Sequence, residues 1–71
     1  MMNLAKVIKR QSIPWILDSG ATVNPPVDTI VQYEELPSGK RGDYWRRVYF
    51  PGYASRMKIS MIAFNRYFGE L

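Results

Sequence analysis

The side chains that could do chemistry in this chain are mainly arginines and lysines, because its 71 residues include no histidine and no cysteine. Without these two residue types, a Ser-His or Cys-His nucleophile pair cannot form, and the usual zinc sites are excluded as well. The carboxylates are Asp18, Asp28, Glu34, Glu35, Asp43 and Glu70. Glu34 and Glu35 are adjacent, so on a strand they would point to opposite faces and could not act as a catalytic pair. We therefore expect no enzymatic activity, no metal and no cofactor.

The basic residues give a net charge of +4 and are distributed unevenly along the chain. Residues 1–11 carry a net charge of +3, residues 12–36 carry −4, and residues 37–71 carry +5. Two basic regions on a small domain suit a polyanion, because each phosphate that the protein neutralises releases bound counterions. Arginine, which makes planar bidentate contacts to phosphate and guanine, accounts for five of the seven basic residues after residue 36. This pattern favours nucleic acid as the partner.

Helical spacing of apolar residues is found in the first fifth of the chain. From Asn3 to Gln11 they recur at positions i, i+3 and i+4, which predicts a short helix. A second helix is expected from about Ile13 to Ser19, and a single helix kinked at Pro14 is the alternative. Residues 21–28 contain two consecutive prolines, which exclude a helix and indicate an extended connector.

A period of two begins at residue 29 and predicts strands. Residues 29–36 and 44–50 are rich in β-branched and aromatic residues, so they are expected to form a β-hairpin around a basic loop at 37–43. Residues 56–60 are a candidate third strand. A final amphipathic helix is expected to begin near Ser60, which can cap it. The core face of this helix consists of Met61, Phe64 and Phe68.

Two short helices, a stiff connector, a hairpin and a last helix follow one another in the order of a small winged-helix domain. We therefore predict an α+β fold, with residues 1–71 forming one winged-helix-like domain that binds duplex DNA. The hairpin would act as the wing on the DNA backbone, and the second helix would lie in the major groove. The predicted phosphate contacts are Lys40, Arg41, Arg46 and Arg47, and the predicted base-edge contacts are Gln11 and Ser12.

A family resemblance supports this layout. The segment SGKRGDYWRRVYFPGY (residues 38–53) resembles the wing and following strand of phage excisionases of the Cox type. The segments LDSG and PPVD are similar to the end of the recognition helix and the link to the wing in Cox-type and lambda-type excisionases. The resemblance implies an architectural protein that binds repeated sites, self-associates along DNA and bends it, and biases a phage integrase toward excision. Some members of the Cox type also repress transcription.

Two other hypotheses stay open. In the first, residues 29–60 form a small SH3-like or OB-like barrel that binds single-stranded nucleic acid. Its stacking platforms would be Tyr33, Tyr44, Trp45 and Tyr49. In the second, the chain is a phage-type adaptor that binds and inhibits a host protein through its aromatic hairpin.

The amino-terminal segment MMNLAKVIKRQ lacks the long apolar run and the small-residue cleavage site of a secretory signal. No stretch of the sequence approaches the roughly 20 apolar residues of a membrane span. We therefore expect a cytoplasmic protein without a membrane partner.

Overall fold

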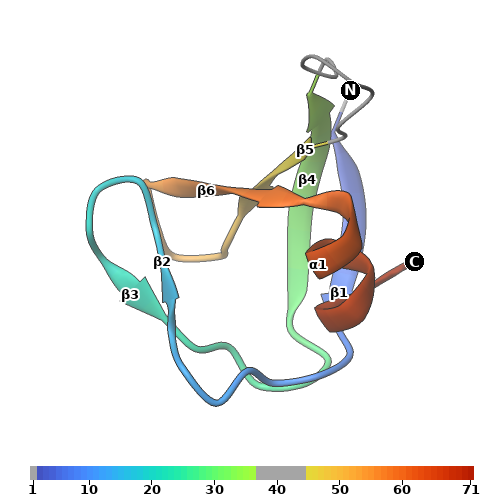
Figure 1. Ribbon diagram of the computed structural model, residues 1–71, viewed down its shortest axis with the longest axis horizontal. Helices are drawn as coiled ribbons and strands as arrows, with labels where there is room; N and C mark the ends of the chain where they lie inside the picture. The colour runs from blue at the N-terminus through green and yellow to red at the C-terminus, as the bar shows by residue number, and fades with distance from the viewer. Residues whose placement is uncertain (1, 37–44) are drawn as a thin grey trace.

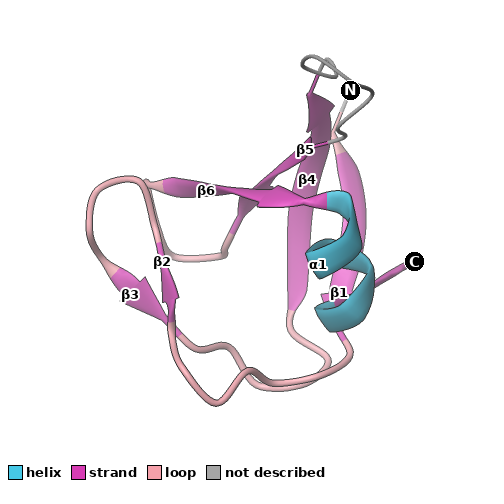
Figure 2. Cartoon of the chain, in the orientation of Figure 1, coloured by secondary structure: helices cyan, strands magenta, loops and turns pink. Residues whose placement is uncertain are grey.

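Strands dominate this structure, a computed structural model that describes residues 2–36 and 45–71. The elements are β1 (Asn3–Val7), β2 (Trp15–Ile16), β3 (Thr22–Val23), β4 (Ile30–Leu36), β5 (Trp45–Tyr49), β6 (Arg56–Ser60), α1 (Met61–Tyr67) and β7 (Phe68–Glu70). Figure 1 traces the chain through them, and Figure 2 separates the strands from the helix. The predicted α+β winged-helix-like fold is wrong, because α1 is the only helix of the described ranges and the two helices predicted before the hairpin are replaced by strands and connections.

The main sheet is antiparallel and has five strands in the order β6-β5-β4-β1-β7. Strands β4, β5 and β6 follow one another in sequence and in space. Strand β1 lies between β4 and β7, so the two ends of the described chain meet in the sheet. The short pair β2–β3 forms a separate sheet within the long connection from β1 to β4.

The five-stranded sheet must curl, because α1 joins its two edge strands. In a flat sheet, β6 and β7 would be separated by four strand spacings, or about 19 Å. A helix of seven residues spans only about 10 Å. The sheet therefore bends around the core, and α1 bridges the gap between its edges, where it packs on β5, β6 and β7 (Figure 1).

The helix predicted from Asn3 to Gln11 is a strand over its first part. The helical spacing i, i+3, i+4 corresponds to Leu4, Val7 and Ile8. In the structure Ala5 and Val7 of β1 are buried, whereas Leu4, and Ile8 just after the strand, are about half exposed. A segment of only five residues can fit the helical period and the strand period at once. The local apolar pattern therefore could not decide whether residues 3–7 form a helix or a strand. Pairing decides it, since β4 and β7 together satisfy the backbone groups of this central strand.

The second predicted helix, from about Ile13 to Ser19, is also absent. Its middle forms β2, which pairs with β3. A tight turn follows, closed by hydrogen bonds from Leu17 N to Ala21 O at 2.8 Å and from Gly20 N to Leu17 O at 2.8 Å. Gly20 has φ of +89°, a conformation that glycine adopts easily. It therefore lies in the turn that joins β2 to β3, and it does not terminate a helix as predicted. With both helices gone, no recognition helix exists among the described residues.

The second half of the sequence was predicted more successfully. Strands β4 and β5 pair in antiparallel register, with Glu34 opposite Arg47, and the candidate strand at 56–60 is β6. The last helix begins where it was predicted, because the Ser60 hydroxyl accepts a hydrogen bond from Ala63 N at 3.2 Å. The loop at 37–43 lies outside the described residues.

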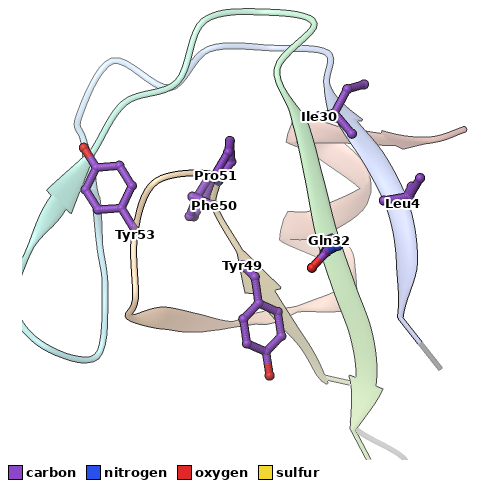
Figure 3. Close-up of a pocket in the computed structure, with 7 residues that line it drawn as sticks. All are labelled: Leu4, Ile30, Gln32, Tyr49, Phe50, Pro51 and Tyr53. Carbon is purple, nitrogen blue, oxygen red and sulfur yellow. The ribbon is translucent and has the colours of Figure 1, made fainter.

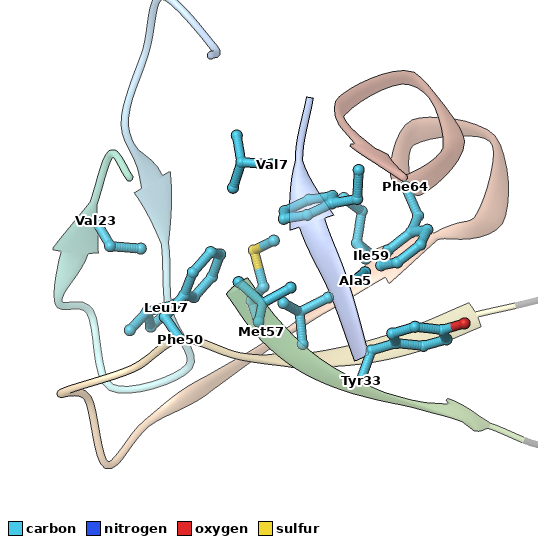
Figure 4. Packing of buried hydrophobic residues seen from close by; sticks show 12 residues of the cluster. Ala5, Val7, Leu17, Val23, Tyr33, Phe50, Met57, Ile59 and Phe64 are labelled. Atoms are coloured by element: carbon cyan, nitrogen blue, oxygen red, sulfur yellow. The ribbon is translucent and has the colours of Figure 1, made fainter. Parts of the chain in front are cut away.

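Aromatic rings fill the centre of the core (Figure 4). Phe64 is fully buried, with its ring centroid 5.0 Å from that of Phe68 and 4.8 Å from that of Tyr33. Trp15 packs edge-on against Tyr67 at 5.2 Å, which attaches the β2–β3 hairpin to this core. The sheet, the helix and the hairpin therefore share one hydrophobic core.

Candidate functional site

Strands β4, β5 and β6 present one side to the core and the other to solvent. Their burial alternates with a period of two, so every second side chain points outward. We call these outward side chains the outer face. Its members are Ile30, Gln32, Glu34 and Leu36 of β4, Trp45, Arg47 and Tyr49 of β5, and Arg56, Lys58 and Ser60 of β6.

Cross-strand register interleaves aromatic and cationic side chains on the outer face. Tyr49 lies opposite Arg56, and Arg47 lies opposite Lys58. The Lys58 ammonium lies 4.9 Å from the centroid of the Trp45 ring, within cation–π distance. Two cations, Arg56 and Lys58, thus stand beside two aromatic rings on a single surface.

Arg47, a predicted phosphate contact, is paired with an acid of its own chain. Its Nη1 donates to Glu34 Oε1 at 3.0 Å, and the Tyr49 hydroxyl donates to the same oxygen at 2.9 Å. The hydrogen bond from Tyr49, followed by that from Arg47, lowers the pKa of Glu34 below its usual value. The charge of Arg47 is therefore locally compensated, and the excess positive charge of the outer face comes from Arg56 and Lys58.

Arg46, another predicted phosphate contact, points into the core. Its side chain is 6% exposed, and its Nη2 lies 3.1 Å from Glu35 Oε1 and 3.5 Å from Glu70 Oε1. The guanidinium also lies 4.6 Å from the ring centroid of Phe64 and 4.9 Å from that of Tyr33. An arginine in this position cannot reach a phosphate at the surface without leaving the core.

The remaining predicted contacts are not on the outer face. Gln11 and Ser12 lie in the connection between β1 and β2, where Gln11 Nε2 donates to Ile13 O at 2.9 Å. Lys40 and Arg41 lie outside the described residues. Arg56 and Lys58, by contrast, were counted only as charge in the sequence. The alternation of RMKIS signalled them, since basic residues two apart on a strand share one face.

A groove extends the outer face toward β1 (Figure 3). It has a volume of about 420 Å³. Its lining includes Leu4, Ile30, Gln32, Tyr49, Pro51 and Tyr53. In Figure 3, Ile30, Gln32 and Leu4 come from β4 and β1, and Tyr53 and Pro51 stand across from them in the segment after β5. Among the described residues that line the groove, none is charged, in contrast to the neighbouring strand β6.

Tyr33 gives a pH-dependent prediction for this architecture. Its hydroxyl donates to Glu70 Oε1 at 2.8 Å, and burial, followed by this hydrogen bond, raises the pKa of Tyr33 above its ordinary value of 10.0. A raised pKa stabilises the fold fully below the unfolded value, and this stabilisation is lost as pH rises through the folded value. We expect the melting temperature to fall above about pH 10, and Tyr33→Phe to flatten that fall. Melting curves followed by circular dichroism check this.

The control for this prediction is Tyr53→Phe, which removes a hydroxyl from an exposed ring that is outside the core. Its melting temperature should depend on pH as that of the parent does. If Tyr33→Phe keeps the full alkaline fall, the ionisation of the buried Tyr33 hydroxyl is not its source.

No group of three or more His, Cys, Asp or Glu side chains that could hold a metal ion is present in the described ranges. No helix in the described part of the chain has both the length and the apolar character that a membrane crossing requires. Comparison with known proteins found no matching family model, no matching curated protein and no matching solved structure.

Proposed function

We propose that this domain binds nucleic acid through the outer face, without catalysing a reaction. One observation carries the proposal, namely that Arg56 and Lys58 stand beside Tyr49 and Trp45 on the solvent side of β5 and β6. Surfaces that bind single strands combine cations, which follow the phosphates, with aromatic rings, on which bases stack. The outer face offers both kinds of group within two adjacent strands.

The geometry favours a single strand over a duplex. Rings held on a sheet surface can stack only on bases that are not already stacked and paired within a double helix. Duplex readout in the predicted winged-helix layout required the second helix, at about Ile13 to Ser19, to lie in the major groove, and the described residues form no helix there. The excisionase role and its integrase partner therefore stay predictions from the resemblance alone, and this proposal does not depend on them.

The affinity of this surface should depend steeply on salt. We expect a labelled 12-nucleotide single strand to bind more tightly than a duplex of the same sequence, as measured by fluorescence anisotropy. The double variant Arg56→Ala/Lys58→Ala should weaken binding on all sequences. It should also reduce the slope of log Kd against log salt by about 1.4, since each phosphate contact to a single strand contributes about 0.7.

A matched control removes the same charge elsewhere. Lys9→Ala/Arg66→Ala takes two cations from the segment after β1 and from α1, so it should change the slope much less. If both double variants lose the same affinity and the same salt slope, the effect comes from the overall charge of the protein. That result would contradict a specific nucleic-acid-binding surface on β5 and β6. The absence of binding to any polynucleotide at low salt would reject the proposal outright.

A protein-binding adaptor is the second candidate, and one observation favours it. Arg46 and Arg47, on which the predicted phosphate grip relied, both pair with carboxylates of the chain itself. An aromatic interface with a protein would bind with little dependence on salt, because few counterions are released. The same salt titration, carried out on any captured partner protein, separates the two functions.

A further inference from the structure

We infer that the groove beside the outer face receives one base of the bound single strand, and that Gln32 hydrogen-bonds the edge of this base. The inference rests on the proposed function and extends it from phosphate and stacking contacts to a base-binding pocket. The position of the groove relative to the cations, the chemistry of its lining and its size support this assignment.

The groove and the cationic strand are joined by Tyr49. This residue lines the groove and belongs to the outer face, and it lies opposite Gln32 on one side and Arg56 on the other. Gln32 and Arg56 are therefore two strand spacings apart, or about 10 Å. One nucleotide spans such a distance from its phosphate to the far edge of its base. A phosphate held at Arg56 would thus place its own base or the next one at the groove.

The lining of the groove suits a base and does not suit a phosphate. Leu4, Ile30, Pro51 and Tyr53 supply apolar and aromatic surface, and no charged side chain lines the groove in the part of the chain that the structure describes. Leu4, Ile30 and Tyr53 are all between 43% and 48% exposed, so the described residues leave much of this surface uncovered. A flat, uncharged ring would cover it, while the charged part of the nucleotide stays at β6.

Gln32 supplies the polar group of the groove. Its side chain is exposed on β4, and within the described residues no hydrogen bond to its amide is found. An amide offers a donor and an acceptor side by side, which is the pattern that base edges complement. Few polar groups in a mainly apolar pocket are what fixes the orientation of a ligand. The volume of about 420 Å³ is also in the range of small-molecule pockets.

Tyr53 is the residue to test first, because it is 43% exposed and does not belong to the buried core cluster. Tyr53→Ala should weaken the binding of a 12-nucleotide single strand by roughly 5- to 150-fold, the range for loss of one stacked base. The salt slope should stay unchanged, since no charge is removed. An abasic sugar-phosphate strand of the same length should bind the parent and the variant equally. Ile62→Ala, an exposed apolar truncation on α1, is the control and should leave both affinities as they are.

Gln32→Leu tests base recognition separately. The affinities of the parent for the homopolymers dT12, dC12 and dA12 should differ from one another. The variant should bind the three with similar affinities, and the salt slope of its binding should stay unchanged. An unchanged ranking would remove Gln32 from the proposal.

The two proposals fail differently. If Arg56→Ala/Lys58→Ala weakens binding and Tyr53→Ala does not, the nucleic-acid surface stands and the base pocket is rejected. If the parent binds no polynucleotide, both are rejected. In that case, capture of an apolar peptide that Tyr53→Ala abolishes would identify the groove as a protein-docking site.

Discussion

Phe64→Ala is expected to destabilise the domain by about 3 to 5 kcal/mol, the range for truncating a fully buried phenylalanine. The Phe64 ring is 0% exposed and touches the rings of Tyr33 and Phe68 and the guanidinium of Arg46. Its loss would open a cavity at the point where α1, β4, β5 and β7 meet. A chain of this size has a total stability on the order of 5 kcal/mol, so the variant should melt tens of degrees below the parent or fail to fold. Thermal and urea unfolding followed by circular dichroism measure this.

Two further variants make the prediction decisive. Ile62→Ala lies on the same helix but is 79% exposed in the parent, so it should change stability by no more than about 0.5 kcal/mol. Phe64→Leu keeps much of the volume and should fall between the two. If Phe64→Ala unfolds at the temperature of the parent, the core described above is not the core of the protein in solution.

Arg46→Ala is expected to cost about 3 kcal/mol, and Arg46→Met to cost about 1 kcal/mol or less. The reason lies in the partners of the guanidinium. Glu35 and Glu70 are 63% and 62% exposed, so water can solvate them once the arginine is gone. The larger loss is that of packing against the rings of Tyr33 and Phe64, which a methionine of similar length largely restores, with a sulfur–aromatic contact in place of the cation–π contact. Urea unfolding of both variants measures the difference.

The same pair of variants tests the role of Arg46 in binding. Because its side chain faces the core, Arg46→Met should bind a single strand as the parent does, with an unchanged salt slope. A slope reduced as strongly as in Arg56→Ala/Lys58→Ala would show that Arg46 reaches phosphates. Equal destabilisation by alanine and methionine would instead assign the stability to the ion pairs. We expect the two variants to differ, because the ion pairs use only Nη2, whereas Nε and Nη1 of Arg46 are buried without a hydrogen-bond partner in the described residues.

Three carboxylates of the chain form ion pairs with two arginines that the sequence analysis predicted to contact phosphates. Glu34 neutralises Arg47 on the outer face, while Glu35 and Glu70 hold Arg46 at the edge of the core. On strands β4, β5 and β6, what is left for a polyanion is therefore Arg56 and Lys58 of β6 and the rings that flank them, while Lys6 on β1 lies 3.9 Å from Asp28. Because ion pairs within the chain compensate part of the positive charge, we expect base stacking to contribute a larger share of the binding free energy than the net charge of +4 indicates.

The sequence by itself determined the features that short-range chemistry controls. Alternation with a period of two predicted the strands that became β4 and β5, and because Arg46 and Arg47 are adjacent in β5 they lie on opposite faces of the sheet. The capping serine located the start of α1, since a hydroxyl that accepts from the helix backbone acts within three residues. The absence of histidine and cysteine restricted the chemistry in the same direct way.

Only the tertiary structure decided what residues 3–19 become and which face of the hairpin is buried. The segment at 3–7 fits both periods, and it is a strand because β4 and β7, distant in sequence, pair with it on both sides. The alternation of side chains along β5 separates its two faces but does not show which face packs against the core. The ion-pair partners of Arg46 and Arg47 therefore could not be predicted from the positions of these residues in the sequence. That choice depended on where α1 packs, because the face that covers Phe64 becomes the core and the other face is left for a ligand.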